Sequence, residues 1–368
     1  MKKILLIADS NMSLSGVPVV YMSIIRQLHQ NYTFDIIIFN DNDMFFEKEF
    51  LSFGGKIYKF EFQKPKNFFK KFLWLFYSYP KSVKYFLNKN LNIKDYFVIH
   101  SFQEGFSFPF FKYGKKAGIN NRILHICSAA SAYPPKKSLK KRLFIWYQKK
   151  SKKLCTKLIF VSRQSLKYNN FKNKGVVVYN TYNEEKFDKL TPCTHQNLVL
   201  TQIGTFSSRK NQLFSLEVVK IIKDVNSNVI LNIVGKSLNE EIEKNYLNKM
   251  NEYIHKEKLD MNVVFWDPES NREELNKITS YILYPSILES FGLVLIESQA
   301  SGIHCFANKC IPNDADMGNV DFLELDSKLW ADKIIKHYEK NGNNRKSPVN
   351  KSKFSTKHFI ETFKELYK

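Results

Sequence analysis

Two glutamates in residues 285–297 have a spacing that suits one shared ligand. The stretch reads PSILESFGLVLIE, with seven residues between Glu289 and Glu297. Each carboxylate can accept more than one hydrogen bond, so the pair could bind hydroxyl groups of a sugar or ribose. The alternative is a solvated helix that carries two ordinary glutamates.

The same stretch predicts the positive end of a helix between the two glutamates. Ser290 is a good N-cap and Gly302 a good C-terminal stop, so a helix is expected to begin near Phe291. Free NH groups and the helix dipole together form an anion site at such a start. Gly292 would let a phosphate approach the backbone closely. The expected donors are the NH groups of Gly292, Leu293 and Val294.

Two successive sets of strands and helices would position these residues. Continuous apolar runs at 3–8 and 34–39 are typical of strands covered on both faces. Further strands of the first set are expected at 56–60, 96–100, 122–127, 157–161 and 175–179. After the polar stretch 191–195, strands are expected at 198–203, 228–234, 263–266 and 281–284, with a helix at 211–225. This alternation predicts a parallel, doubly wound sheet in each set.

The chain therefore divides into two domains and a final helix. At roughly 100–200 residues per domain, a length of 368 residues suggests two. We expect an N-terminal Rossmann-like domain over 1–190, a C-terminal one over 191–350, and an amphipathic helix in 351–368 that could pack back on the first domain. No stretch approaches the roughly 20 apolar residues of a membrane span. Five cysteines are too few for a disulfide scaffold.

The net charge differs between the two halves of the chain. The whole chain has a net charge of +22, the first 180 residues carry +23, and no acidic residue occurs between Glu104 and Glu184. Such a surface attracts polyanions. Segments 64–85 and 136–153 interleave basic and aromatic residues, which favours docking on an anionic membrane surface, with a core helix that has a solvated basic face as the alternative. Nucleic acid is not expected as a partner, because no recognised nucleic-acid-binding signature is present.

The stretch around Glu289 and Glu297 resembles the E-x7-E signature of the retaining GT-B glycosyltransferases of glycosyltransferase family 4. Residues 203–211, IGTFSSRKN, look like that family's phosphate loop after the first strand of the second domain. Further similar segments are 178–180, 233–235, 310–316 and 329–331. The resemblance is strongest over 200–335. It implies an α/β fold of the GT-B type, in which two Rossmann-like domains have parallel sheets that face each other across a cleft.

In the second domain the resemblance assigns roles to individual residues. Glu297 would hold the ribose hydroxyls of the donor. Glu289 would contact hydroxyls of the transferred sugar and is the first catalytic candidate. The NH groups of Gly292 and Leu293 would bind the distal phosphate, and Lys210 would neutralise the diphosphate leaving group.

One position departs from the family pattern. The family usually has Arg directly after the glycine of the phosphate loop, where this sequence has Thr205. Arg209 could supply the missing charge, or it could be a solvated residue at the start of a helix. Ser290 and Phe291 complete the expected donor-binding set in this domain.

In the first domain the resemblance points to three positions. Gly16 would present bare backbone to the donor phosphates. His125 would lie beside the donor sugar as a second catalytic candidate, and His100 would lie on the acceptor side, each with a structural histidine as the alternative. Residues 41–43, DND, mimic a D-x-D metal motif, but a polar turn is expected there. No cofactor and no metal requirement are expected.

The function that this resemblance implies is retaining transfer of a sugar from a nucleotide-diphosphate donor, most often a UDP-sugar in relatives. The expected acceptor is a lipid-linked or growing saccharide in the synthesis of a bacterial surface polysaccharide such as capsule or lipopolysaccharide. The expected location is cytoplasmic, peripheral on the inner face of the cell membrane. Two alternatives remain: an inactive GT-B subunit that supports a partner glycosyltransferase, and a GT-B sugar-nucleotide epimerase, which would need no acceptor.

Overall fold

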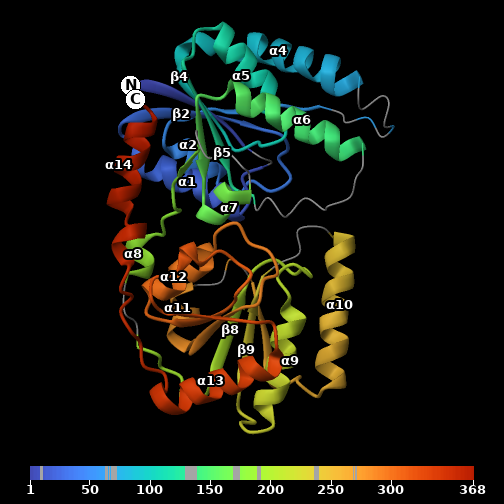
Figure 1. Ribbon diagram of the computed structural model, residues 1–368, viewed down its shortest axis with the longest axis vertical. Coiled ribbons are helices and arrows are strands. Elements are labelled where there is room, and N and C mark those ends of the chain that lie inside the picture. Colours follow the sequence, from blue (N-terminus) through green and yellow to red (C-terminus); the bar gives the residue numbers. More distant parts are fainter. Residues whose placement is uncertain are drawn as a thin grey trace. The chain divides into compact units, whose positions relative to one another are not determined.

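The chain forms two compact α/β units, each built on one parallel sheet. Unit 1 comprises Met1–Asn180 and Lys357–Lys368, and unit 2 comprises Thr181–Thr356. The first segment of unit 1 ends at Asn180, before the predicted boundary at 190. A helix that follows unit 2 in the chain belongs to unit 1 again (Figure 1). The computed structural model describes residues 1–8, 11–62, 65, 67, 73–128, 139–168, 175–188, 192–235, 240–267, 269 and 272–368.

The sheet of unit 1 has seven strands in the order β3-β2-β1-β4-β5-β6-β7, and every neighbouring pair is parallel. The strands are β1 (Lys2–Ile7), β2 (Tyr32–Ile38), β3 (Ile57–Lys59), β4 (Tyr96–Ser101), β5 (Asn121–Ile126), β6 (Lys157–Phe160) and β7 (Gly175–Val177). They lie at the places that the apolar runs predict. Residues Ile4–Ile7 of β1 are all buried, as expected for a strand covered on both faces.

Three helices pack on one face of this sheet: α4 (Tyr79–Asn90), α5 (Phe108–Lys116) and α6 (Leu139–Leu154) (Figure 1). Phe86 of α4, Phe110 of α5 and Tyr147 of α6 belong to one buried cluster with the strands. The other helical segments that precede unit 2 are α1 (Gly16–Leu28), α2 (Glu47–Ser52), the π-helical turn η1 (Trp74–Ser78), η2 (Ile93–Asp95) and α7 (Arg163–Tyr168).

The last helix, α14 (Thr356–Leu366), packs against unit 1. The carbonyl of Leu366 accepts hydrogen bonds from Asn121 Nδ2 at 2.8 Å and from Lys157 Nζ at 2.6 Å. The buried hydroxyl of Tyr367 lies 2.8 Å from Nδ1 of His100. These contacts join the end of α14 to three strands of the first sheet.

Unit 2 has six parallel strands in the order β10-β9-β8-β11-β12-β13. They are β8 (Val199–Ile203), β9 (Ile230–Val234), β10 (Val263–Trp266), β11 (Tyr281–Tyr284), β12 (His304–Asn308) and β13 (Val320–Leu323). The helical segments are α8 (Glu184–Phe187), α9 (Gln212–Lys223), α10 (Glu240–Lys256), α11 (Arg272–Ile278), α12 (Leu293–Ala300), η4 (Asn313–Ala315), α13 (Ser327–Asn341) and η5 (Lys351–Phe354). The structure therefore adds β12 and β13 to the four strands that the sequence predicts.

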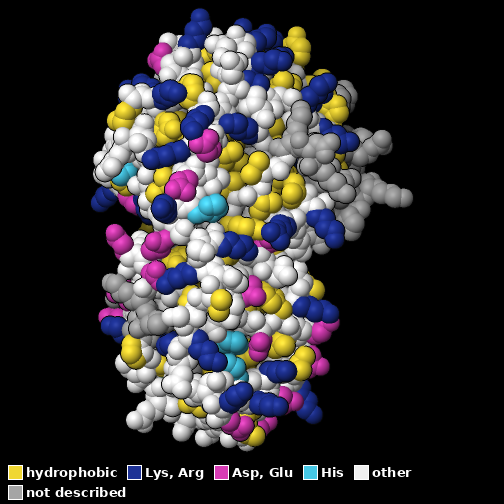
Figure 2. Space-filling model, turned by 60° about the vertical axis from the view of Figure 1, so that its left-hand side comes forward, with side chains coloured by type: hydrophobic (Ala, Val, Ile, Leu, Met, Phe, Trp, Pro, Cys, Tyr) yellow, Lys and Arg dark blue, Asp and Glu magenta, His cyan; other side chains and the backbone are white. Residues whose placement is uncertain are grey.

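The charge asymmetry of the sequence is visible on the surface. In the view of Figure 2, the surface of unit 1, in the upper part, carries many Lys and Arg side chains and few acidic ones, whereas unit 2 presents both signs. Helix α6 alone has the sequence LKKRLFIWYQKKSKKL, without an acidic residue. Among the described residues, no helix combines the length and the apolar character that crossing a membrane requires.

Candidate active site

The helix that follows β11 begins at Leu293, later than the sequence predicts. Its N-cap is Gly292, with a φ of 120°, a conformation that L residues rarely adopt. This turn leaves Ser290 and Phe291 outside the helix, so the assignment of Ser290 as N-cap is wrong. The first hydrogen bonds of α12 run from the NH groups of Leu295 and Ile296 to the Gly292 carbonyl.

The backbone at this helix start can bind an anion. The NH groups of Leu293 and Val294 precede those first hydrogen bonds, at the positive end of the helix dipole. A Cβ on Gly292 would lie 3.3 Å from Leu295 Cδ1 and 3.5 Å from the Cβ of Ala315, so the turn is also tightly packed. The expected NH donors are therefore present, but the helix geometry comes from glycine and not from a serine cap.

Glu289 lies directly before this turn and forms an ion pair with Lys210. Nζ of Lys210 lies 2.5 Å from Oε1 of Glu289, and the two side chains are only 13% and 12% exposed. The ammonium group also lies 5.3 Å from the centre of the Tyr284 ring. Thus two residues that are 79 positions apart in the sequence meet beside the start of α12.

Tyr284, the last residue of β11, completes this cluster. Burial raises the pKa of Tyr284 well above its ordinary value, and the nearby Glu289 carboxylate raises it further. The hydroxyl therefore stays protonated and can donate a hydrogen bond to that carboxylate. From the sequence, Tyr284 is expected at a strand end, without a role in the site. Its position immediately before Pro285 and the predicted site was the available signal.

Glycines shape the phosphate loop that carries Lys210. Gly204, with a φ of 154°, follows β8, and a Cβ there would lie 3.1–3.3 Å from the Lys210 side chain. A Cβ on Gly235, after β9, would lie 2.1 Å from the Gly204 carbonyl oxygen. Only glycine fits both positions. The lysine stem therefore passes close over the bare backbone at the end of the strand.

Hydrogen bonds join this loop to the glutamate loop. The NH of Ile287 donates to the Arg209 carbonyl at 2.9 Å. Gln202 Nε2 donates to the Lys210 carbonyl at 2.7 Å, and Gln212 Nε2 donates to the Thr205 carbonyl at 3.0 Å. Lys210 and Glu289 are thus fixed by backbone contacts on both sides of their ion pair.

Thr205 and Arg209 lie on the same loop. Thr205 is half-buried, and Arg209 is exposed. The positive charge of Arg209 opposes the rise in the pKa of Tyr284, which places the guanidinium near the cluster. An exposed cation beside Lys210 is therefore available to a phosphate, although the threonine itself supplies no charge.

Glu297 lies one turn inside α12 and is paired with Arg272. Nη2 of Arg272 is 3.4 Å from Oε2 of Glu297, with exposed fractions of 13% and 20%. Burial raises the pKa of Glu297, whereas the charges of Arg272 and Lys186 lower it. Burial in turn lowers the pKa of Arg272. Arg272 is not predicted from the sequence, because no motif links it to Glu297.

His100 and His125 of unit 1 are fully buried and touch each other. Nε2 of His100 lies 3.3 Å from Nδ1 of His125, and Nδ1 of His100 is bonded to Tyr367. Burial lowers the pKa of His125 to about 3, and it lowers that of His100 well below its usual range. Both rings are therefore neutral at neutral pH.

These contacts do not fit the direct roles predicted for the histidines. Both ring nitrogens of His100 have partners inside unit 1, so an acceptor role for His100 is not supported. His125 has a free Nε2 among the described residues, but its ring is covered by Phe102 and Phe363. The structure assigns both histidines to the packing under α14.

Gly16 and the DND segment also belong to unit 1. Gly16 is the first residue of α1, and a Cβ there would meet nothing within 4 Å. Asp41 forms an exposed ion pair with Lys59 at 2.6 Å. Within the described part of the chain, no group of three or more His, Cys, Asp or Glu side chains is arranged to hold a metal ion.

Comparison with known protein families bears on this geometry. Residues 182–319 match the family model described as Glycosyl transferases group 1. The matched range lies within unit 2. The matched range includes Lys210, Arg272, Glu289 and Glu297.

Named relatives extend the likeness beyond this domain. The capsular polysaccharide biosynthesis glycosyltransferase CapH of Staphylococcus aureus is 23% identical over 337 residues, which cover 89% of this chain and 88% of CapH. The putative glycosyltransferase EpsF of Bacillus subtilis is 28% identical over 144 residues, which cover 38% of this chain and 35% of EpsF. Together with the match to the group 1 model, these relatives support a glycosyltransferase.

Solved structures show the same fold. Anabaena HepE, in complex with UDP and glucose, has a TM-score of 0.77 at 16% identity, with 98% of both chains covered. Staphylococcus aureus TarM has a TM-score of 0.75 at 13% identity, with 100% of both chains covered. The two-sheet α/β architecture is therefore that of the GT-B glycosyltransferases.

Proposed function

We propose that this protein is a retaining glycosyltransferase that uses a nucleoside diphosphate sugar, with UDP as the favoured nucleotide. The observation that carries the proposal is the buried Lys210–Glu289 pair beside the NH groups that begin α12. A cation and a helix start bind a diphosphate, while a carboxylate next to them binds hydroxyl groups. The complexes of HepE with UDP and with UDP-glucose support the choice of nucleotide.

Each residue of the site has one task in this proposal. Lys210 and the NH groups of Leu293 and Val294 stabilise the negative charge that develops on the departing diphosphate. Glu289 accepts hydrogen bonds from the transferred sugar. Glu297, held by Arg272, accepts those of the ribose. The acceptor hydroxyl attacks the face from which the nucleotide leaves, and the leaving phosphate takes the proton.

The proposed acceptor is a lipid-linked or growing saccharide of a surface polysaccharide, and the proposed place is the inner face of the cell membrane. CapH, by its name, supports a role in capsule synthesis. The membrane part is supported by an aromatic–lysine ridge on unit 1, defined by exposed Leu73, Phe76, Tyr77, Ile145 and Trp146 with Lys81 and Lys150.

Contacts within the ridge hold its aromatic rings together. The ring centres of Phe76 and Trp146 are 4.6 Å apart, which joins η1 to α6. Nζ of Lys150 lies 5.0 Å from the centre of the Trp146 ring, and Nζ of Lys81 lies 4.2 Å from that of Tyr77. Lysines beside exposed aromatic rings suit the boundary between anionic headgroups and acyl chains. Residues 68–72 and 136–138 of the two predicted segments lie outside the described residues.

A donor screen tests the proposed reaction. The full chain is incubated with a panel of nucleotide sugars, with and without lipid-linked acceptors, and both released nucleotide and sugar products are measured. We expect UDP release from one UDP-sugar, stimulated by an acceptor. Binding without turnover would favour the inactive subunit. Conversion of the sugar nucleotide without any acceptor would favour the epimerase.

A further inference from the structure

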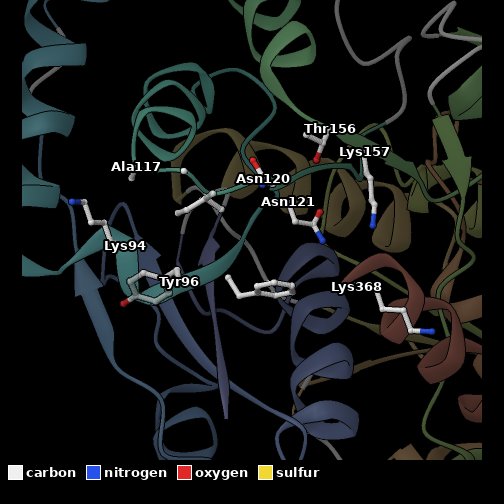
Figure 3. A pocket seen from close by; sticks show the side chains of 11 residues that line it. Lys94, Tyr96, Ala117, Asn120, Asn121, Thr156, Lys157 and Lys368 are labelled. Carbon is white, nitrogen blue, oxygen red and sulfur yellow. The ribbon is translucent and has the colours of Figure 1, made fainter.

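Unit 1 contains a pocket of about 420 Å³ at the amino-terminal ends of three strands. Tyr96 and Phe97 begin β4, Asn121 begins β5 and Lys157 begins β6. The remaining lining residues are Lys94, Ala117, Gly118, Ile119, Asn120, Thr156 and Lys368 (Figure 3). Because the strands are parallel, the pocket lies at the sheet edge opposite their carboxyl ends, about 20 Å away for a six-residue strand.

A buried acceptor atom in this pocket has no partner. Asn121 is 8% exposed, and its Nδ2 donates to the Leu366 carbonyl at 2.8 Å. Its Oδ1 is buried and makes no hydrogen bond with the described residues. A buried amide oxygen without a donor is costly, so a ligand hydroxyl that donated to it would be favoured.

The charged groups of the lining are all cationic. Lys94, Lys157 and Lys368 line the pocket, and none of the lining residues is acidic. Glu365, just outside, forms an ion pair with Lys368. Nζ of Lys157 donates to the Leu366 carbonyl, which bears no full charge, and burial lowers the pKa of Lys157. The charge of Glu365 raises that pKa in part, and an anionic ligand group near Lys157 would further offset the cost of burying the ammonium group.

One ligand class meets these requirements together. We propose that this pocket binds an acidic sugar unit, whose ring hydroxyls donate to Asn121 Oδ1 and whose acid group lies near Lys157 and Lys94. Asn120 supplies further hydrogen-bonding groups, and the half-buried ring of Phe97 offers an apolar wall. The volume is within the range of small-ligand pockets.

This site is separate from the proposed donor site, all of whose residues belong to unit 2. In an enzyme that extends a saccharide, a second pocket of this kind would hold part of the chain already made. That role rests on the proposed function. The binding itself does not, because it requires neither a nucleotide nor turnover.

Ligand binding to the full chain tests the proposal. Saturation-transfer NMR is used with methyl glucuronide, glucose 1-phosphate and glucose. Inorganic phosphate, which has no carbon-bound proton to observe, is titrated in as a competitor. The first two share ring hydroxyls and a negative charge, but one carries a carboxylate, as in a saccharide chain, and the other a phosphate, as in a free sugar phosphate. We expect one or both to bind about tenfold more tightly than glucose or phosphate.

Three matched substitutions locate the site. Lys157→Gln keeps a donor for the Leu366 carbonyl but removes the charge, and Lys94→Gln removes the charge at the rim. Lys84→Gln, on the exposed face of α4, makes the same change elsewhere. We expect the first two to weaken binding of the acidic sugar by about tenfold and the third to leave it unchanged.

Four results would overturn the proposal. The first is that neither acidic sugar binds, and the second is that Lys84→Gln weakens acidic-sugar binding as much as the other two substitutions do. The third is that inorganic phosphate binds as tightly as the acidic sugars, and the fourth is that UDP displaces the bound acidic sugar. Failure of the proposed function would look different, because UDP would then fail to bind while the acidic sugar still bound and still responded to Lys157→Gln.

Discussion

Lys210 and Glu289 neutralise each other in the structure, and this has a chemical consequence. A buried charge without a partner is strongly unfavourable, so each member of the pair offsets the cost of burying the other in a largely buried site. When a diphosphate arrives, Lys210 can exchange or share its partner, and Glu289 becomes available to sugar hydroxyls. The site is therefore prepared for a ligand that brings a negative charge and hydroxyl groups together.

Replacing Lys210 tests this exchange. Lys210→Met should weaken UDP binding by about 1.5–3 kcal/mol, because a charge-assisted hydrogen bond to phosphate is lost. Lys220→Met is the matched control, since Lys220 also pairs with a glutamate, Glu257, but on the exposed side of α9. Calorimetry should show a loss for the first variant alone. Equal UDP affinity in both variants would exclude Lys210 from the donor site.

The pKa of Glu297 predicts how UDP binding responds to pH. Burial raises this pKa, and the charge of Arg272 holds it down. Arg272→Gln should raise it further, so that Glu297 becomes protonated at a higher pH and stops accepting two hydrogen bonds. As pH is lowered from 8, UDP affinity should therefore be lost at a pH about one unit or more higher than in the unaltered protein.

A double variant controls for other effects of Arg272. In Glu297→Gln the side chain at position 297 does not titrate. Adding Arg272→Gln to this variant should therefore not change the pH at which UDP affinity is lost. Calorimetric titrations of UDP across the pH range compare the four proteins. A shift of the same size in the Glu297→Gln background would mean that another group titrates.

Single residues also show where sequence reasoning stops. The sequence predicted Glu289, Glu297 and Lys210, because each belongs to a local pattern. The two glutamates have a fixed spacing, and the lysine follows a predicted strand. Arg272 was not predicted, since its contact with Glu297 depends on how α11 packs beside α12. The prediction of Ser290 as N-cap was wrong because the positive φ of Gly292 makes the helix begin later, at Leu293. The residue types around Gly292 do not reveal that backbone angle.

At the scale of elements, α14 stabilises unit 1 through a buried polar contact. Tyr367→Phe removes the hydroxyl bonded to His100, and it should lower the free energy of unfolding by about 1–3 kcal/mol, because a buried histidine nitrogen loses its partner. Tyr85→Phe is the control, because Tyr85 is exposed on α4. Denaturant unfolding measures the loss.

Hydrogen exchange locates the same effect. Peptides from β4 and β5 should exchange faster in Tyr367→Phe, while those from β8 and β9 should not, because α14 belongs to unit 1. Uniform acceleration in both units, or none in either, would contradict the packing of α14 described here.

Strands differed in how far the sequence predicted them. The long apolar runs of β1 and β2 were clear, whereas β12 and β13 were missed. β12 reads HCFAN and β13 reads VDFL, and all four residues of β13 are only half-buried. Such short segments have neither the alternation of a half-buried strand nor a long apolar run. Only the pairing of β12 with β11 and of β13 with β12 defines them.

At the scale of the whole molecule, charge and exposed aromatic rings predict membrane binding. Each Lys or Arg near an anionic surface contributes about 1 kcal/mol. The full chain should float with anionic vesicles, less with neutral ones, and less again near 1 M salt, where the Debye length is about 3 Å. Flotation independent of lipid charge would contradict the electrostatic part.

A matched pair of variants tests the ridge itself. Phe76→Gln with Trp146→Gln should reduce flotation on anionic vesicles, because the apolar part of binding is lost. Phe265→Gln, which removes an exposed ring from β10 of unit 2, should not. Equal loss in both would show that the ridge has no special role.

Turnover should not depend on a divalent metal ion. In the proposed mechanism, protein cations and backbone NH groups meet the charge of the leaving diphosphate, and Asp41 is engaged by Lys59. Activity in the presence of EDTA should equal that without it. If activity were lost with the chelator and recovered with Mn²⁺, the DND segment at 41–43 would again be a candidate metal site.

The return of α14 to unit 1 also orders events during synthesis. Unit 2 is one continuous segment, Thr181–Thr356, whereas unit 1 needs residues made before it and after it. At about 5–20 residues per second, the ribosome takes on the order of 10–35 s to make the intervening segment. Throughout that interval, the nascent sheet around His100 and His125 lacks the helix that covers it. Unit 2 can therefore fold before unit 1 is complete, and the apolar residues that pack under α14 stay uncovered until that helix emerges.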